Sequence, residues 1–514
     1  MGQSGKVIFK AYQQDQISIL PPSLEEMIES NHPVRIVNSV IDQINLKPLE
    51  KQYKGGGTSS YSPRMLLKVL VYSYLRNIYS SRKMEEMTKE NIHMMWLSGM
   101  SHPDHHTINR FRSERLKECL REIFSQVVMM LLDAGQLSLK ELYIDGTKLE
   151  ANANKYTFVW GRSIKKSKER IKEQLQELWD YTQKIAEEEK LDNTEIKYGE
   201  IDSEKVKETI EKINELLKEK EVSQKIKQKL SYAKKHWPKN LDKYKEQEAI
   251  LKKRNSYSKT DKDATFMRMK EDHMKNGQLK AGYNVQISSN NQYVVNYSIH
   301  QKPGDTTTLP SHMEEHKAMY GENPEVVVAD AGYGSEENYT YLENNEVEAY
   351  IKYNTFDKEQ KKTRKEEKPF SPEKLRFDKE KDCFYCPTGQ MMHRIGEKRK
   401  RSENNYERLL VQYQAQNCEG CSIRGVCHNQ KGNRIIEISH VGNYLRKKAK
   451  DKLESETGIY YRKKRCADVE PVFANVKHNK NFKRFLLRGI EKVTVEIGLV
   501  TMAHNLSKWA TISA

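Results

Sequence analysis

A long charged stretch in the middle of the chain sets the strongest limit on the fold. Between about Ile164 and Lys253 the sequence is almost entirely Lys, Glu and Gln, with scattered Leu and Ile near heptad spacing. This pattern predicts antiparallel helices or a short coiled coil. Strand patterns occur on both sides of this stretch, so we expect a β-sheet that is interrupted by a helical arm.

The predicted strands are short apolar runs. Leu142-Tyr143-Ile144 precedes Asp145 and Gly146, and the sheet resumes after the arm. The later runs are 283–287, 293–299 and 326–330, with a further candidate at 350–352. Helical spacing of apolar residues predicts a bundle in the first 135 or so residues, with Asp104 as a helix N-cap, and helices again from Tyr460 onward. Together these patterns predict an α/β fold.

The net charge limits the partners. Lys and Arg total 89 against 72 Asp and Glu, which leaves +17. An excess of this size favours polyanions, of which nucleic acid is the commonest, with acidic membrane surface as the alternative. No run of 18 apolar residues occurs, and the start lacks the apolar core of a signal peptide. We therefore expect a cytoplasmic, nucleoid-associated protein with no membrane partner.

Three acidic residues are the candidates for catalysis. Asp145 and Asp330 each end an apolar strand and are followed closely by glycine, and carboxylates so placed can converge on one sheet edge and bind divalent cations. Glu470 begins a helical segment and shares one face with Lys477. Three carboxylates beside a cation suit two-metal phosphoryl transfer. The alternatives are strand-capping aspartates and a helix N-terminal glutamate favoured by the helix dipole.

These motifs resemble those of a known family, the DDE transposases of bacterial insertion sequences, specifically insertion-sequence group 1182. The resemblance covers nearly the whole chain. It rests on Tyr-Ile-Asp145-Gly-Thr, on Asp263 to Lys270 leading into Gly282-Tyr-Asn-Val-Gln, on Asp330-Ala-Gly-Tyr, and on Val-Glu470-Pro-Val-Phe.

The resemblance implies a fold and an activity. The fold would be α/β, an RNase H-like mixed sheet with an all-helical N-terminal domain, an inserted charged helical arm and an inserted Cys-rich module. Asp145, Asp330 and Glu470 would bind two Mg²⁺ (or Mn²⁺) ions for DNA cleavage and strand transfer. The partners would be double-stranded DNA, both transposon ends and target, and further copies in a dimer or higher assembly. The alternatives are a domesticated RNase H-like nuclease and a catalytically inactive DNA-binding scaffold.

The family's wider superfamily also has a Tyr, Arg, Glu and Lys signature, which this chain matches in part. Glu470 and Lys477 fit it, whereas Cys466 and Lys463 stand at the Arg and Tyr positions. The neighbouring Arg465 and Tyr461 are therefore candidate DNA contacts, as is Lys477. We interpret Asp305, in Gly-Asp-Thr-Thr-Thr, as a helix N-cap in preference to a fourth metal ligand.

Five cysteines form a second candidate metal site. Cys383-x2-Cys386 is followed by Cys418-x2-Cys421 and then Cys427. Paired C-x2-C predicts structural Zn²⁺, although the gap between the pairs exceeds that of the usual zinc ribbon and one cysteine is spare. Free thiols are the alternative. Such a zinc ion would hold an insertion together without taking part in catalysis.

Two basic regions are candidates for DNA contact. Arg110, Arg112 and Arg115 lie on one predicted helix that could enter a groove or grip phosphates, with a solvated helix face as the alternative. The charged arm could bind DNA or another protomer, or it could simply be solvated. The predicted organisation is a DNA-binding domain at 1–136, an RNase H-like core at 137–163 and 259–355, the arm at 164–258, the Cys-rich insertion at 356–455 and the C-terminal core helices at 456–514.

Overall fold

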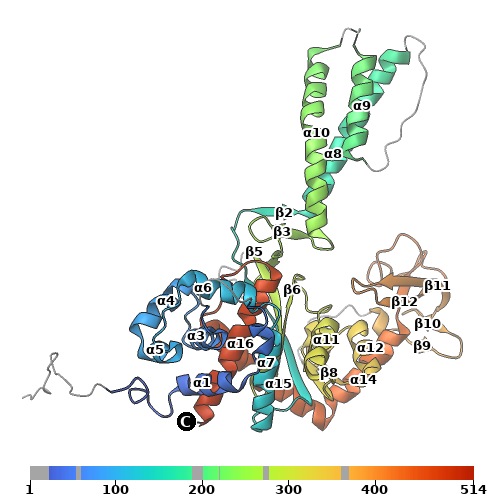
Figure 1. Ribbon diagram of the computed structural model, residues 1–514. Coiled ribbons are helices and arrows are strands. Elements are labelled where there is room, and N and C mark those ends of the chain that lie inside the picture. The colour runs from blue at the N-terminus through green and yellow to red at the C-terminus, as the bar shows by residue number, and fades with distance from the viewer. Residues whose placement is uncertain are drawn as a thin grey trace, which may run out of the picture.

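The computed structural model describes residues 22–53, 60–187, 201–218, 220, 222–269, 277–360 and 370–513 (Figure 1). Lys270, which ends one of the motifs named above, lies outside these ranges, as does part of the charged arm. The chain folds into a mixed α/β structure, as the sequence predicts. No helix among the described residues is long and apolar enough to cross a membrane.

A six-stranded mixed sheet forms the centre of the molecule. Its order is β4-β5-β1-β7-β8, and β6 also pairs with β5. β1 runs antiparallel to β5 and parallel to β7, which in turn runs parallel to β8. The strands are β1 (Glu141–Glu150), β4 (Thr265–Arg268), β5 (Leu279–Asn290), β6 (Tyr293–His300), β7 (Val326–Ala329) and β8 (Glu348–Ile351).

Helices cover both faces of this sheet because its strands are apolar on both sides. In β7 every residue is buried, with Val327 in the main core and Val328 in a smaller core on the other face. The smaller core is closed by α14 (His440–Glu454) and α15 (Glu456–Ala474), which continues into a π-helical turn, η4 (Asn475–Asn479). The other face packs against α16 (Ile490–Ser513). The helices α11 (Leu309–Tyr320) and α12 (Glu336–Asn344) connect β6, β7 and β8.

The N-terminal helices share the main core with the sheet. α16 packs against α1, α3 and α7 as well as β6, so that one cluster extends from Val34 to Leu506. Asp104 is the N-cap of α6, as predicted. These elements are α1 (Pro33–Gln43), α2 (Lys47–Glu50), α3 (Pro63–Leu75), α4 (Ser81–Glu90), α5 (Ile92–Ser98), α6 (His105–Arg110), η1 (Phe111–Arg115) and α7 (Leu120–Asp133).

The charged stretch folds as an arm of three helices that stands away from the sheet (Figure 1). The arm has its own core, in which Trp179, Ile213 and Trp237 are buried, and a two-stranded ribbon forms its base. Its elements are β2 (Phe158–Trp160), α8 (Gly161–Glu187), α9 (Ser203–Leu216), α10 (Gln224–Leu251) and β3 (Ser256–Ser258).

The cysteines lie in and around a separate five-stranded antiparallel sheet, which we call the Cys-rich sheet. Its strands run in the order β13-β12-β11-β10-β9. They are β9 (Phe377–Asp378), β10 (Cys383–Tyr385), β11 (Met391–Arg401), β12 (Glu407–Ala415) and β13 (Ile435–Ile438). The short helix α13 (Phe356–Gln360) and the 3₁₀ turn η3 (Pro372–Lys374) lie between the central sheet and this one along the chain.

Candidate active site

Asp145 and Asp330 occupy equivalent positions on neighbouring parallel strands. The register of β1 and β7 pairs Ile144 with Ala329, and each aspartate is the next residue along its strand direction. Neighbouring strands lie about 4.8 Å apart, so parallel pairing places the two carboxylates side by side where β7 ends, a place that we call the carboxylate edge. The prediction that Asp145 ends its strand is wrong, because β1 continues along β5 to Glu150, whereas β7 ends at Ala329. Both aspartates are half-buried. The Asp330 carboxylate also accepts a hydrogen bond of 2.8 Å from the Gly332 amide and caps the 3₁₀ turn η2 (Ala331–Tyr333), so the strand-capping alternative describes part of its role.

Arg465 of α15 reaches the Asp145 carboxylate from the helix above the sheet. Its Nη1 lies 3.5 Å from Asp145 Oδ2, and the arginine side chain is only 13% exposed. This Nη1 is buried and makes no hydrogen bond within the described part of the chain. A guanidinium in this position holds Asp145 in place.

Asp305 is a third carboxylate at this edge, and the interpretation of this residue as a helix N-cap is wrong. The N-cap of α11 is Thr308, whose amide binds the backbone carbonyl of Asp305. The Asp305 side chain turns instead to the sheet, where its Oδ1 accepts hydrogen bonds from Asn284 (2.7 Å) and Gln286 (2.9 Å) of β5. Sequence reasoning missed these two amides, although the alternation along β5 places them on one face.

Tyr333 is the buried residue around which these carboxylates gather. Burial raises the pKa of its hydroxyl well above the ordinary value, and the negative charges of Asp305, Asp145 and Asp330 add to the effect. The phenol therefore stays protonated and donates to Gln286 Oε1. It anchors the amide that binds Asp305.

Glu470 lies on an exposed part of α15, close to the C-terminal end of this helix. The prediction that it begins a helix is therefore wrong, and so is the alternative of a helix N-terminal glutamate. Two residues earlier, Asp468 is buried and accepts hydrogen bonds from Ser289 of β5 (2.6 Å) and from the Gln292 amide (3.2 Å). Two residues correspond to about 200° around an α-helix, so Glu470 leaves the helix on the flank opposite Ser289. β7, which ends at Asp330, lies on the other side of β1 from β5.

The other two residues predicted on this helix are buried. The Tyr461 hydroxyl donates to Glu141 Oε1 at 3.1 Å, at the far end of β1 from Asp145, and its ring packs near Tyr143 and Tyr350. Lys477, in the η4 turn, is 8% exposed. Neither presents its side chain on an open surface.

A groove of about 340 Å³ lies beside the segment that carries Asp305, although none of the three aspartates lines it. Gly304 and Thr306, the neighbours of Asp305, line one side, and Trp160 and Phe266 supply aromatic rings. Three cations, Lys253, Arg254 and Lys302, also line the groove. The β11–β12 turn reaches it through Glu403, whose carboxylate lies 2.8 Å from Lys302 Nζ.

The arginines of the N-terminal helices differ in their exposure. Arg110 is exposed and pairs weakly with Glu114 at 3.7 Å. Arg112 is 3% exposed and donates inward to the Tyr79 carbonyl (2.7 Å) and the Tyr74 hydroxyl (3.2 Å). DNA cannot reach Arg112 in this fold, so its predicted contact with DNA is not retained.

The cysteines do not gather around one point. Cys418 Sγ and Cys427 Sγ both accept hydrogen bonds from buried Arg434, from its amide (3.3 Å) and its Nη1 (3.0 Å) respectively. Cys383 is buried in β10, while Cys386 lies 3.0 Å from the Thr388 hydroxyl and Cys421 is partly exposed. A guanidinium beside two sulfurs disfavours a second cation there. The zinc site and the free-thiol alternative both stay predictions.

Within the described ranges, no three His, Cys, Asp or Glu side chains are placed to hold a metal ion. The carboxylate edge still has suitable chemistry, because Mg²⁺ is commonly bound by one or two carboxylates together with water and substrate phosphate. A Cβ atom built on Gly332 would lie 2.9 Å from Asp330 Oδ1 and 3.6 Å from Asp305 Oδ2. Two hard oxygen donors therefore flank one point beside this glycine.

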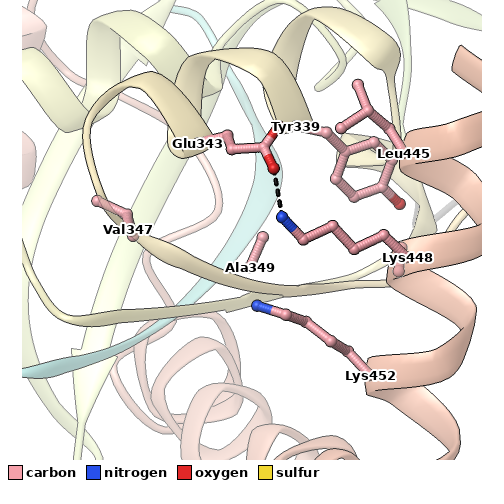
Figure 2. Close-up of a pocket in the computed structure, with 8 residues that line it drawn as sticks. Tyr339, Glu343, Val347, Ala349, Leu445, Lys448 and Lys452 are labelled. Carbon is pink, nitrogen blue, oxygen red and sulfur yellow. Dashed lines mark hydrogen bonds and ion pairs between the residues drawn. The ribbon is translucent and has the colours of Figure 1, made fainter. Parts of the chain in front are cut away.

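A crevice of about 50 Å³ elsewhere has no residue in common with this edge. It lies between α12, β8 and α14, as Figure 2 shows. Glu343 and Lys448 form an ion pair across it, while Tyr339, Ala349 and Leu445 make its walls apolar. This arrangement joins α14 to the central sheet and offers no catalytic group.

Comparison with known families gives two matches. Residues 385–510 match the family described as Transposase DDE domain, and residues 22–114 match the family described as Transposase domain (DUF772). The first match includes Arg465, Glu470 and the Cys-rich sheet from β10 onward, whereas Asp145 and Asp330 lie outside both. No curated protein and no solved structure matches the chain. The matches support a transposase of the insertion-sequence DDE type.

Proposed function

We propose that this chain is a DDE transposase of an insertion sequence. It binds the terminal inverted repeats of its element, cuts DNA strands there and joins them to target DNA. The observation that carries the proposal is the shared register position of Asp145 and Asp330 on neighbouring parallel strands. Two transposase families matching opposite ends of the chain support it. We assign the central sheet to the RNase H-like class, with the arm and the Cys-rich sheet as insertions, and the family to insertion-sequence group 1182.

The residues have distinct roles in this proposal. Asp145 and Asp330 provide carboxylate oxygens, and Glu470 adds a third from the flank of α15. When bound there, divalent cations such as Mg²⁺ or Mn²⁺ neutralise charge on the phosphate and lower the pKa of the attacking oxygen. Arg465 lies against the Asp145 carboxylate and orients it. Synapsis of two DNA ends requires at least two copies of the chain.

The groove beside Asp305 is the proposed path of the DNA strand. Lys253 and Lys302 suit the phosphate backbone, and the partly exposed Trp160 offers a face on which a base stacks. Arg110, which is exposed, is a further proposed phosphate contact on the N-terminal helices.

The test uses the full-length protein with duplexes carrying the terminal inverted repeat of its element. We expect strand cleavage that requires Mg²⁺ or Mn²⁺, followed by joining to a plasmid. Glu470→Gln should abolish both steps and leave DNA binding intact. The matched control is Glu456→Gln, an exposed acid at the start of the same helix. Cleavage without joining would instead indicate a nuclease, and DNA binding without cleavage in either metal would indicate an inactive scaffold.

A further inference from the structure

We propose that Asp305 is a fourth carboxylate of the catalytic centre and ligates the same divalent cation as Asp330. This inference rests on the proposed function, because it adds a ligand to the site defined there. It assigns a direct role to a residue outside the Asp145, Asp330 and Glu470 triad.

Two glycines let Asp305 approach both β1 and the end of β7. A Cβ atom on Gly146, the residue after Asp145, would lie 2.7 Å from Asp305 Oδ1. A Cβ atom on Gly332 would lie 3.6 Å from Asp305 Oδ2 and 2.9 Å from Asp330 Oδ1. Asp305 therefore lies between the segments that carry the two predicted catalytic aspartates, with one oxygen facing each segment.

A buried hydrogen-bond chain fixes this orientation. Tyr333 donates to Gln286, and Gln286 and Asn284 both donate to Asp305 Oδ1. All three donors are at most 1% exposed. Because these bonds occupy Oδ1, Oδ2 is the oxygen turned toward Asp330. Buried polar networks of this kind hold a side chain in one geometry, as a metal ligand requires.

The negative charges of Asp305 and Asp330 favour a bound cation between the two carboxylates. Asp305 and Asp330 are close, and neither forms an ion pair with Lys or Arg among the residues that the structure describes. Two carboxylates so close repel each other. A divalent cation between Asp305 Oδ2 and Asp330 Oδ1 would turn that repulsion into attraction, and its remaining positions would be filled by water and a substrate phosphate.

The experiment measures Mn²⁺ binding to the full chain without DNA, by calorimetric titration. We expect Asp305→Asn to weaken the Mn²⁺ affinity at least tenfold, comparable to Asp330→Asn. The asparagine carbonyl can still accept the hydrogen bonds from Asn284 and Gln286, so the melting temperature of the metal-free variant should change little. Glu322→Gln, an exposed acid on the loop before β7, is the charge control and should bind Mn²⁺ as the unmodified protein does.

The outcomes separate this inference from the proposed function. Wild-type Mn²⁺ affinity in Asp305→Asn, together with weakened affinity in Asp330→Asn, would overturn the inference and leave the proposed function standing. Wild-type Mn²⁺ affinity in both variants would show that neither residue binds the metal ion, and it would contradict the metal site of the proposed function as well. A second measurement needs no variant: bound Fe²⁺ with peroxide should cut the backbone of the unmodified protein near Asp305 as well as near Asp330. Cuts near Asp330 alone would overturn the inference.

Discussion

The carboxylate edge of the central sheet and the Cys-rich sheet are the two regions with candidate metal ligands, and they assemble in opposite ways. Asp145 and Asp330 are far apart in sequence, yet the register of β1 and β7 brings them to one edge. Cys418 and Cys427 are close in sequence, yet Arg434 is the hydrogen-bond partner of both.

Strand register brings together residues that are far apart in the chain, whereas close spacing along the chain does not by itself bring side chains to one point. A C-x2-C pair can bind a metal only if the second pair folds against it. Parallel pairing, in contrast, aligns the carboxyl ends of strands whatever the length of chain between them. The substitutions that follow test whether the carboxylate edge is a functional metal site and whether the Cys-rich sheet is held by packing alone, without a metal ion.

The largest effect should come from neutralising the carboxylate edge. We expect Asp145→Asn and Asp330→Asn each to lower the DNA cleavage rate by at least about 10³-fold, because the loss of a carboxylate ligand removes electrostatic stabilisation of the transition state. Asparagine preserves the shape of each side chain, so Asp330→Asn should shift thermal unfolding little. Asp145→Asn should lower the melting temperature, because it leaves the mostly buried Arg465 guanidinium without its carboxylate. Retained cleavage in either variant would contradict the assignment of that residue.

The second effect concerns acid stability, in which the central sheet should differ from the Cys-rich sheet. Burial lowers the pKa values of His300, His316 and His504 to about 4, and that of His312 well below its ordinary value. These groups stay neutral in the folded chain, whereas the unfolded chain takes up protons below about pH 6.5. Stability is therefore present above that pH and is lost as the pH falls toward 4, by up to about 3 kcal/mol for each histidine.

Calorimetry between pH 7.5 and 5 measures this loss. Both ring nitrogens of His316 are buried without a hydrogen bond in the described structure. We therefore expect His316→Leu to narrow the difference in melting temperature between the two pH values. An unchanged difference would show that His316 does not contribute to the acid sensitivity.

The sequence predicted the elements whose pattern is local. The apolar runs at Tyr143, Tyr283, Tyr293 and Val326 are all strands of the central sheet, and the heptad-like charged stretch is helical. Local side-chain chemistry was also sufficient to predict Asp104 as the N-cap of α6.

The sequence could not predict contacts that depend on tertiary packing. Arg112 is of a residue type that often contacts DNA, but its segment packs against Tyr74 and Tyr79. Its guanidinium donates hydrogen bonds to the Tyr74 hydroxyl and to the Tyr79 carbonyl. Asp305 precedes a helix, as an N-cap would, yet Thr308 is the N-cap of that helix. The Asp305 carboxylate accepts hydrogen bonds from Asn284 and Gln286 instead. In both cases, residues distant in the sequence decide the partner.

The third effect tests the close approach at the carboxylate edge. The added methyl of Gly146→Ala would meet Gln286 Nε2 and Asp305 Oδ1. We expect a loss of about 1–3 kcal/mol in unfolding free energy, together with weaker Mn²⁺ binding. Gly304→Ala is the matched control, because a Cβ atom there meets nothing within 4 Å. Equal effects of the two substitutions on denaturant unfolding would show that packing around Gly146 is not the cause.

The smallest effect should come from the Cys-rich sheet. Cys386 and Cys421 are partly exposed, and in this structure neither sulfur is part of a cluster of metal-ligating side chains among the described residues. We expect Cys386→Ser and Cys421→Ser each to change the unfolding free energy by less than about 1 kcal/mol, in the range of surface substitutions. A zinc ion bound to these thiolates would make either substitution cost several kcal/mol, since the metal would stabilise the folded state. Metal analysis of the purified chain decides between the two: stoichiometric zinc that both substitutions release would show that Arg434 gives up its sulfur partners when the metal binds, and that spacing along the chain was the better guide in this region.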